Sequence, residues 1–190
     1  VYTYDIGGNI LIKKEYPYTT GAVGSPLNIY TYEYGDSNWK DKLTAYDGKT
    51  IGYDLIGNPT SYDGWSFEWE EGRQLKRMYR AANGQDISFK YNDAGIRTEK
   101  TVGSVVTKYH LAGNKVTFET NGADSIYYTF DSGGSLVSLN LNGVEYYYIR
   151  NGQGDITGLL NSTGTQVVWY SYDTWGRLLS IVDNTLSSVG

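Results

Sequence analysis

A short pattern recurs along the whole chain and restricts the folds that it can adopt. The pattern is an aromatic residue, then Asp or another polar residue, two variable residues, and a Gly that Asn or Arg often follows. Full copies occupy residues 4–9, 53–58, 91–97, 109–114, 130–134 and 172–177. A looser copy that begins with Arg150 occupies 150–155, and a shortened copy occupies 69–73. In the second half the copies lie roughly 20 residues apart, which indicates a tandem array of small supersecondary units.

Each position of the pattern has a physical role in closing a turn. Gly adopts a left-handed backbone at little cost, Asp or Asn accepts hydrogen bonds from nearby backbone N–H groups, and Tyr packs its ring while its hydroxyl stays polar. At Gly57, Gly95, Gly113 and Gly176 we expect φ angles that a Cβ would strain. The residues predicted to carry this structural repeat are Tyr4, Asp5, Gly8, Tyr53, Asp54, Gly57, Tyr91, Gly95, Tyr109, Gly113, Asp131, Gly134, Gly154, Tyr172, Asp173 and Gly176.

A second turn signal lies between successive copies, at Asn121-Gly122, Asn142-Gly143 and Thr163-Gly164. Asn-Gly between β-prone runs is typical of two-residue hairpins, because both central residues of a type I′ turn need φ > 0. One period is therefore interpreted as strand, tight turn, strand and repeat turn. The predicted fold is all-β, a continuous antiparallel meander of hairpins with no helix longer than three turns between residues 85 and 185.

The composition agrees with strands, since the chain has 20 Tyr, 5 Trp and 4 Phe among its 190 residues. We expect one domain over residues 1–190, with irregular, inserted repeats in 1–85 and regular repeats in 86–185. Exposed loops are expected at 17–26 and 36–43, where turn-forming residues gather. No stretch suggests a linker that would divide the chain.

Several functional classes are excluded by what the sequence lacks. Without Cys there is no disulfide scaffold, thiol catalysis or Cys-ligated zinc, and one His, His110, cannot build a multi-His metal site. No apolar run is long enough to span a bilayer as a helix, and a pI near 4.9 without a basic cluster argues against nucleic acid as a partner. The start at Val1 resembles neither a signal peptide nor an initiator, so we expect a piece of a longer chain.

The remaining candidates for chemistry are weak. Glu68 and Glu70 would share a strand face but have no recognisable catalytic context, and His110 is interpreted as a turn residue. The segment 151–155 fails the spacing of a calcium-binding repeat, and the glycosylation sequon at Asn161 is a common chance match. We therefore expect no catalytic residue, no metal and no cofactor.

Three aromatic residues share one strand face at Trp65, Phe67 and Trp69. The simpler interpretation is core packing. The alternative is a platform on which Trp65 and Trp69 stack against sugars.

The repeated pattern resembles the YD repeat of Rhs (rearrangement hotspot) toxins, bacterial wall-associated proteins and teneurins. Residues 53–59, 148–156 and 169–178 carry the resemblance most clearly, and it weakens over 14–45. It implies a sheet that curves or spirals into a shell able to enclose a toxin. The sequence ends at Gly190 without the Asp-Pro-x-Gly motif that marks self-cleavage in that family, so at most an arc of such a shell is expected.

The expected function is architectural and non-enzymatic: a wall segment of a secreted or cell-surface bacterial shell, with other YD repeats and an enclosed cargo as partners. The alternative is a carbohydrate-binding or adhesive surface module. The terminal segments 1–4 and 178–182 are expected to act as open sheet edges, so the isolated chain should self-associate.

Overall fold

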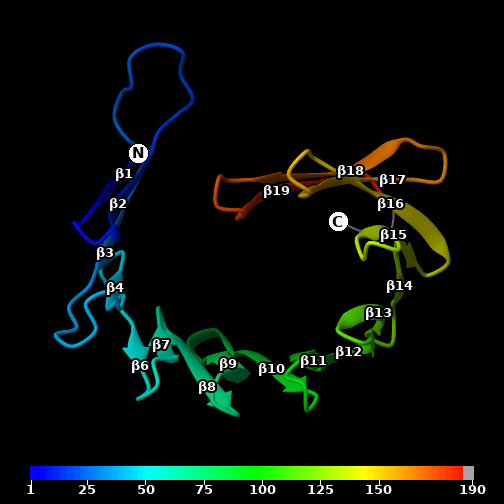
Figure 1. The fold of residues 1–190 in the computed structure, drawn as a ribbon, viewed down its shortest axis with the longest axis horizontal. Coiled ribbons are helices and arrows are strands. Elements are labelled where there is room, and N and C mark those ends of the chain that lie inside the picture. The colour runs from blue at the N-terminus through cyan, green and yellow to red at the C-terminus, as the bar shows by residue number, and fades with distance from the viewer. Residues whose placement is uncertain (186–190) are drawn as a thin grey trace. The chain divides into compact units, whose positions relative to one another are not determined.

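The computed structural model describes residues 1–185 and contains almost only antiparallel strands (Figure 1). The single helical element is a three-residue 3₁₀ turn, η1 (Ala81–Asn83), within the described chain. The predicted all-β meander is confirmed, as is the prediction that no long helix occurs between 85 and 185. None of the described helices is long and apolar enough to cross a membrane.

The chain divides into two compact units, the first comprising Val1–Ser88 and the second beginning at Phe89. This division lies close to residue 85, where the sequence pattern becomes regular. In the first unit, five strands pair in chain order, β1 (Tyr2–Tyr4), β2 (Ile10–Glu15), β3 (Asn28–Glu33), β4 (Ala45–Tyr46) and β5 (Lys49–Thr50). A second meander follows, formed by β6 (Gly52–Tyr53), β7 (Pro59–Tyr62), β8 (Trp65–Glu70), β9 (Gln74–Arg80) and the start of β10 (Gln85–Tyr91).

In the second unit each strand again pairs with the next one along the chain. The strands are β11 (Arg97–Val102), β12 (Val105–Ala112), β13 (Lys115–Thr120), β14 (Ser125–Phe130), β15 (Leu136–Leu141), β16 (Val144–Arg150), β17 (Ile156–Leu160), β18 (Gln166–Tyr172) and β19 (Leu178–Asp183). One face of this unit buries an apolar cluster made of Leu139, Leu141, Tyr146, Leu159 and Val168. These residues face one another because cross-strand pairing places Leu139 opposite Tyr146 and Leu159 opposite Val168.

The glycine prediction is confirmed at all four positions. The φ angles of Gly57, Gly95, Gly113 and Gly176 are 87°, 74°, 63° and 80°. Asn142-Gly143 forms the expected type I′-like turn, since its φ angles are 51° and 92°. Residues 121–124 differ from the expected two-residue turn, because the Asn121 side chain accepts hydrogen bonds from the N–H groups of Ala123 and Asp124 and closes a longer loop.

The interpretation of residues 109–114 as a repeat turn is wrong. Tyr109 and His110 lie inside β12, where Tyr109 is opposite Glu119 and His110 is opposite Phe118. The chain turns later, between Ala112 and Lys115. The physical reason is the second position of the motif: an imidazole has no oxygen that could accept the backbone N–H groups that Asp or Asn gathers.

Candidate functional site

The most regular feature of the structure is a five-residue loop closed by hydrogen bonds within itself. In the copy that begins at Asp54, the Asp54 N–H donates to the Asn58 carbonyl over 2.9 Å, and the Gly57 N–H donates to the Asp54 carbonyl over 3.2 Å. The Asp54 carboxylate accepts from the N–H groups of Ile56 and Asn58 and from the Asn58 side-chain amide. The same pair of backbone bonds closes the loops that begin at Asp5, Asn92, Asp131, Asn151 and Asp173.

The sequence analysis missed one copy of this loop. The Asn161 N–H donates to the Thr165 carbonyl over 2.9 Å, and the Gly164 N–H returns a bond to the Asn161 carbonyl over 3.0 Å. The Asn161 side-chain oxygen accepts from the N–H groups of Thr163 and Thr165. Thr163-Gly164 is thus part of a repeat loop, and the Asn-x-x-Gly spacing at Asn161 was the available signal. This copy does not match the pattern because Leu160 stands at the first position, where the other full copies have an aromatic residue.

Loop closure changes the pKa of the motif carboxylates. Hydrogen bonds from the Asn9 side chain and backbone hold the pKa of Asp5 below its ordinary value. At Asp54, burial acts to raise the pKa, but hydrogen bonds from the Asn58 backbone and side chain outweigh it and lower the pKa. Both carboxylates are therefore stabilised in the ionised, hydrogen-bond-accepting form that the loop requires.

Side chains from neighbouring repeats tie these loops together. The Tyr172 hydroxyl donates to the carbonyl of Ile156, the residue directly after the Asn151 loop, over 2.8 Å. The Arg150 guanidinium reaches the carbonyl of Leu136, directly after the Asp131 loop, over 3.1 Å. The Trp69 indole N–H does the same to Pro59, directly after the Asp54 loop, over 2.7 Å. In these three copies the first residue of the motif donates to the carbonyl directly after an earlier loop, whereas Phe130 occupies the same position without a donor and Tyr53 donates to the Leu43 carbonyl instead.

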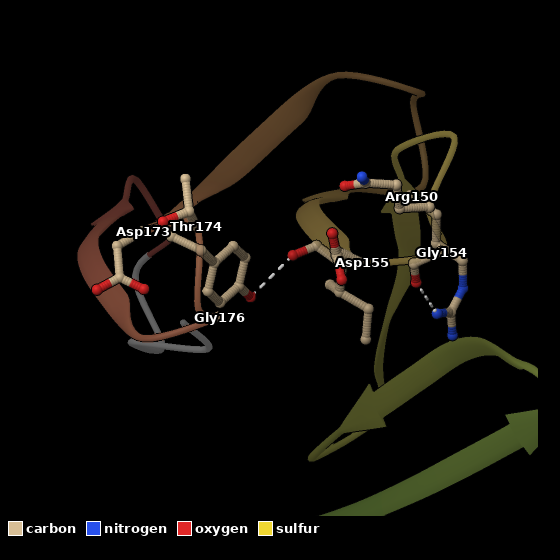
Figure 2. A pocket seen from close by; sticks show the side chains of 9 residues that line it. Arg150, Gly154, Asp155, Asp173, Thr174 and Gly176 are labelled. Atoms are coloured by element: carbon tan, nitrogen blue, oxygen red, sulfur yellow. Dashed lines mark hydrogen bonds between the residues drawn. The ribbon is translucent and has the colours of Figure 1, made fainter. Parts of the chain in front are cut away.

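A pocket of about 720 Å³ lies between two of these loops (Figure 2). Among the lining residues, the Tyr172 hydroxyl donates to the Ile156 carbonyl over 2.8 Å, and the Arg150 guanidinium donates to the Gly154 carbonyl over 2.7 Å. Asp173 accepts from the N–H groups of Trp175 and Arg177. These hydrogen bonds hold the two loops in place.

The two tryptophans proposed for sugar stacking lie on one face of β8 and are half-buried. The Trp69 indole N–H donates a hydrogen bond to the Pro59 carbonyl, and the Arg80 guanidinium lies 5.8 Å from the centre of the Trp65 ring. These contacts support the packing interpretation. The carboxylates of Glu68 and Glu70 pair with Arg77 and Lys76 at 3.4 and 3.5 Å on the neighbouring strand.

The residues that the structure describes contain no cluster of three or more His, Asp or Glu side chains placed to hold a metal ion.

The sequence of the chain is similar to a part of two Bacillus tRNA nucleases. It is 30% identical over 172 residues to the tRNA3(Ser)-specific nuclease WapA of Bacillus spizizenii and 32% identical over 172 residues to the tRNA nuclease WapA of Bacillus subtilis. Each alignment covers 84% of this chain and 7% of the relative, so the chain spans a small part of those proteins. No protein-family model matches the chain.

Solved structures share its fold along almost its full length. A Photorhabdus luminescens Tc holotoxin pore structure matches with a TM-score of 0.67 and 16% identity, covering 98% of this chain and 10% of the other. A TcdB2-TccC3 crystal structure matches with a TM-score of 0.59 and 16% identity, again over 98% of this chain and 10% of the other. These matches show that the chain shares its β-sheet fold with parts of chains in Tc toxin structures.

Proposed function

We propose that the chain is a non-enzymatic YD-repeat segment of the Rhs family that builds part of the wall of a shell around a toxin or other cargo. The observation that carries the proposal is the fold shared with Tc toxin chains over 98% of the residues. The hydrogen bonds of the loops support the proposal, because repeated Asp, Asn and Tyr side chains form hydrogen bonds within the protein. The proposed setting is a secreted or surface-anchored bacterial protein.

The enclosing role is tested in the longest natural chain that contains this segment. Deletion of the hairpin formed by β15 and β16 (Leu136–Leu141 and Val144–Arg150) should open the wall and expose the cargo to protease. A matched insertion of Gly and Ser into the exposed loop at 17–26 should leave the cargo protected. Equal protease resistance in both variants would contradict the proposal.

The absence of enzymatic activity has a separate test. The WapA relatives are named as tRNA nucleases, but the aligned segment is only 7% of their length. The isolated chain should leave total bacterial tRNA intact under conditions in which full-length Bacillus subtilis WapA cleaves it. Cleavage by the isolated chain would assign the activity to the repeats themselves.

Edge pairing with further repeats is the proposed partner interaction. Strand β19 pairs with β18 and exposes Leu179 and Val182 by 55% and 51%. An exposed apolar edge strand is a template for another chain. Sedimentation over a concentration series should show association that Ile181→Pro weakens, because proline blocks edge pairing. A concentration-independent monomer would contradict this partner.

The carbohydrate alternative at Trp65 and Trp69 receives no added support from the geometry, because both side chains contact other parts of the first unit.

A further inference from the structure

Four tyrosine rings form a cluster in the first unit. Tyr30 and Tyr32 lie on β3, Tyr46 on β4 and Tyr62 on β7. The centre of the Tyr46 ring lies 4.9 Å from that of Tyr32, 6.1 Å from that of Tyr30 and 6.3 Å from that of Tyr62. All four side chains are half-buried, so each keeps some contact with solvent. Tyr46 is therefore the shared neighbour of three other phenols.

Tyr32 is the closest of these three neighbours. It lies directly opposite Tyr46 in the antiparallel ladder of β3 and β4, where side chains on neighbouring strands approach most closely. The two ring planes are tilted by 54°. Two rings joined by a single C–C bond are twisted as well, because their ortho substituents clash when the rings are coplanar. The Tyr30 ring, in contrast, lies almost parallel to that of Tyr46, at 15°.

The hydroxyl groups of Tyr32 and Tyr46 also lie close together. Burial raises the pKa of Tyr46 to about 12, with further contributions from the charge of Tyr32 and from a hydrogen bond with its hydroxyl. At neutral pH the Tyr46 phenol stays protonated, so an oxidant must remove a proton together with an electron. Neighbouring hydroxyls bring the ortho carbons of the two rings near each other, and these carbons carry much of the unpaired electron of a phenoxyl radical.

We propose that Tyr32 and Tyr46 form a site of oxidative cross-linking, at which a haem peroxidase using hydrogen peroxide joins the two rings into dityrosine. Each phenol loses one electron and one proton, and the two phenoxyl radicals couple through one C–C bond between ortho carbons. The hydrogen on each coupled carbon then leaves as a proton while the phenol oxygen takes one up. The two electrons and two protons removed reduce one hydrogen peroxide to two water molecules.

A cross-link at this position would hold a weakly secured part of the first unit. The chain contains no Cys, so a disulfide cannot join its strands. Strand β4 is two residues long and pairs with β3 through Tyr32–Tyr46 and Glu33–Ala45. A bond between Tyr32 and Tyr46 would close the loop between them and restrict the unfolded chain, as a disulfide does.

The test is oxidation of the dilute 190-residue chain by a haem peroxidase with a small excess of hydrogen peroxide. The monomer, separated by gel filtration, should gain dityrosine fluorescence and lose the mass of two hydrogen atoms. After digestion with trypsin, residues 43–49, in which Tyr46 is the sole tyrosine, should be joined to residues 15–40. Fragmentation of the joined peptide should place the bond at Tyr32.

Three variants locate the site. Tyr32→Phe and Tyr46→Phe keep a ring but cannot form a phenoxyl radical, so the joined peptide should fall to background in both. Tyr30→Phe is the matched control, because it removes another tyrosine of the same tryptic peptide that also contacts Tyr46, and it should keep the cross-link. Circular dichroism before oxidation checks that each variant is folded.

The proposal is overturned if the monomer contains no joined peptide, or if Tyr32→Phe forms as much of it as the unchanged chain. It is also overturned if the chain unfolded in urea forms the same peptide in equal yield, since the folded pairing of β3 with β4 would then play no part. Thermal unfolding completes the test: the oxidised chain should unfold at a higher temperature than oxidised Tyr32→Phe, relative to each before oxidation. Equal changes would contradict the stabilising role.

Discussion

Strands β15 to β18 in the second unit bury Leu159 and Val168 completely, whereas strands β1 to β9 in the first unit have no apolar side chain as deeply buried among the described residues. In the first unit only Ala45, at 8% exposed, and Asn58, at 3%, reach the buried range. Both units nevertheless contain the same five-residue loop, seen at Asp54 and at Asp173. The loop therefore sets the connections between strands without determining what the sheet buries.

The first unit relies more on aromatic and ionic contacts. The Tyr46 ring lies within 4.9 Å of Tyr32 and 6.3 Å of Tyr62, measured between ring centres, and burial raises the pKa of Tyr46 to about 12. Arg77 pairs with Asp86 at 2.6 Å, although both side chains are well exposed. Exposed ion pairs contribute little stability, typically below about 1 kcal/mol. The comparison predicts that the second unit is the more stable one.

The largest expected effect is at the core of the second unit. Leu159→Ala removes a side chain with 0% exposure and should lower the free energy of unfolding by about 3 kcal/mol, through lost burial and the cavity that remains. Denaturant unfolding measures the change. The control is Leu179→Ala, where the side chain is 55% exposed and the loss should stay below about 1 kcal/mol. Equal losses would remove the distinction between core and edge.

A smaller effect is expected at the shared loop. Gly57→Ala should destabilise the chain by about 1 kcal/mol or more, because φ is 87° and the new Cβ would also lie 2.7 Å from the Trp39 ring. Gly176→Ala measures the backbone strain alone in the second unit, because Gly176 has a φ of 80° and an added Cβ there would meet no other atom within 4 Å. Gly152→Ala is the control, because this loop glycine has neither a positive φ nor a close neighbour. A larger loss at Gly152 than at Gly57 would contradict the account of the loop.

The smallest effects concern pH, and they should have opposite signs in the two units. The pKa of Asp54 is lowered, so its contribution to stability is present above about pH 4 and is lost as the pH falls through its folded-state pKa. Burial raises the pKa of Glu119, so its contribution is present at low pH and is lost as the pH rises through the raised pKa.

Thermal unfolding across pH separates these two contributions. Asp54→Asn should flatten the acid side of the stability profile, and Glu119→Gln should flatten the decline that begins as the pH rises above the ordinary pKa of a glutamate. If Asp54→Asn changed only the decline at higher pH and Glu119→Gln only the acid side, or if neither substitution changed the profile, other groups would control the pH dependence.

Local chemistry explains which parts of the fold could be predicted from the sequence. The positive φ angles at Gly57 and Gly176 and the turn at Asn142-Gly143 follow from residues adjacent in the chain. The pattern failed at His110, whose side chain lacks the oxygen that accepts several loop N–H groups, and overlooked Asn161, where Leu160 replaces the aromatic residue. Both errors came from giving the aromatic residue more weight than the oxygen that closes the loop.

Long-range features could not be obtained in the same way. The burial of Leu159 depends on its pairing with Val168, directly before a register shift between Leu159 and Leu160. No local sequence pattern marks that shift. Tyr109, Tyr128 and Tyr148 face the same side of alternate strands, and this depends on the register of every intervening pair. The register also places Glu119 opposite Tyr109.

The same repeated loop occurs in two units that differ in how firmly their sheets are held. Hydrogen–deuterium exchange of the intact chain, resolved by peptide, measures this directly. The account predicts the slowest exchange in β15 to β18 around Leu159 and Val168, and faster exchange in β4 to β7 around Ala45. Equal protection of the two regions, or slower exchange in β4 to β7, would contradict it.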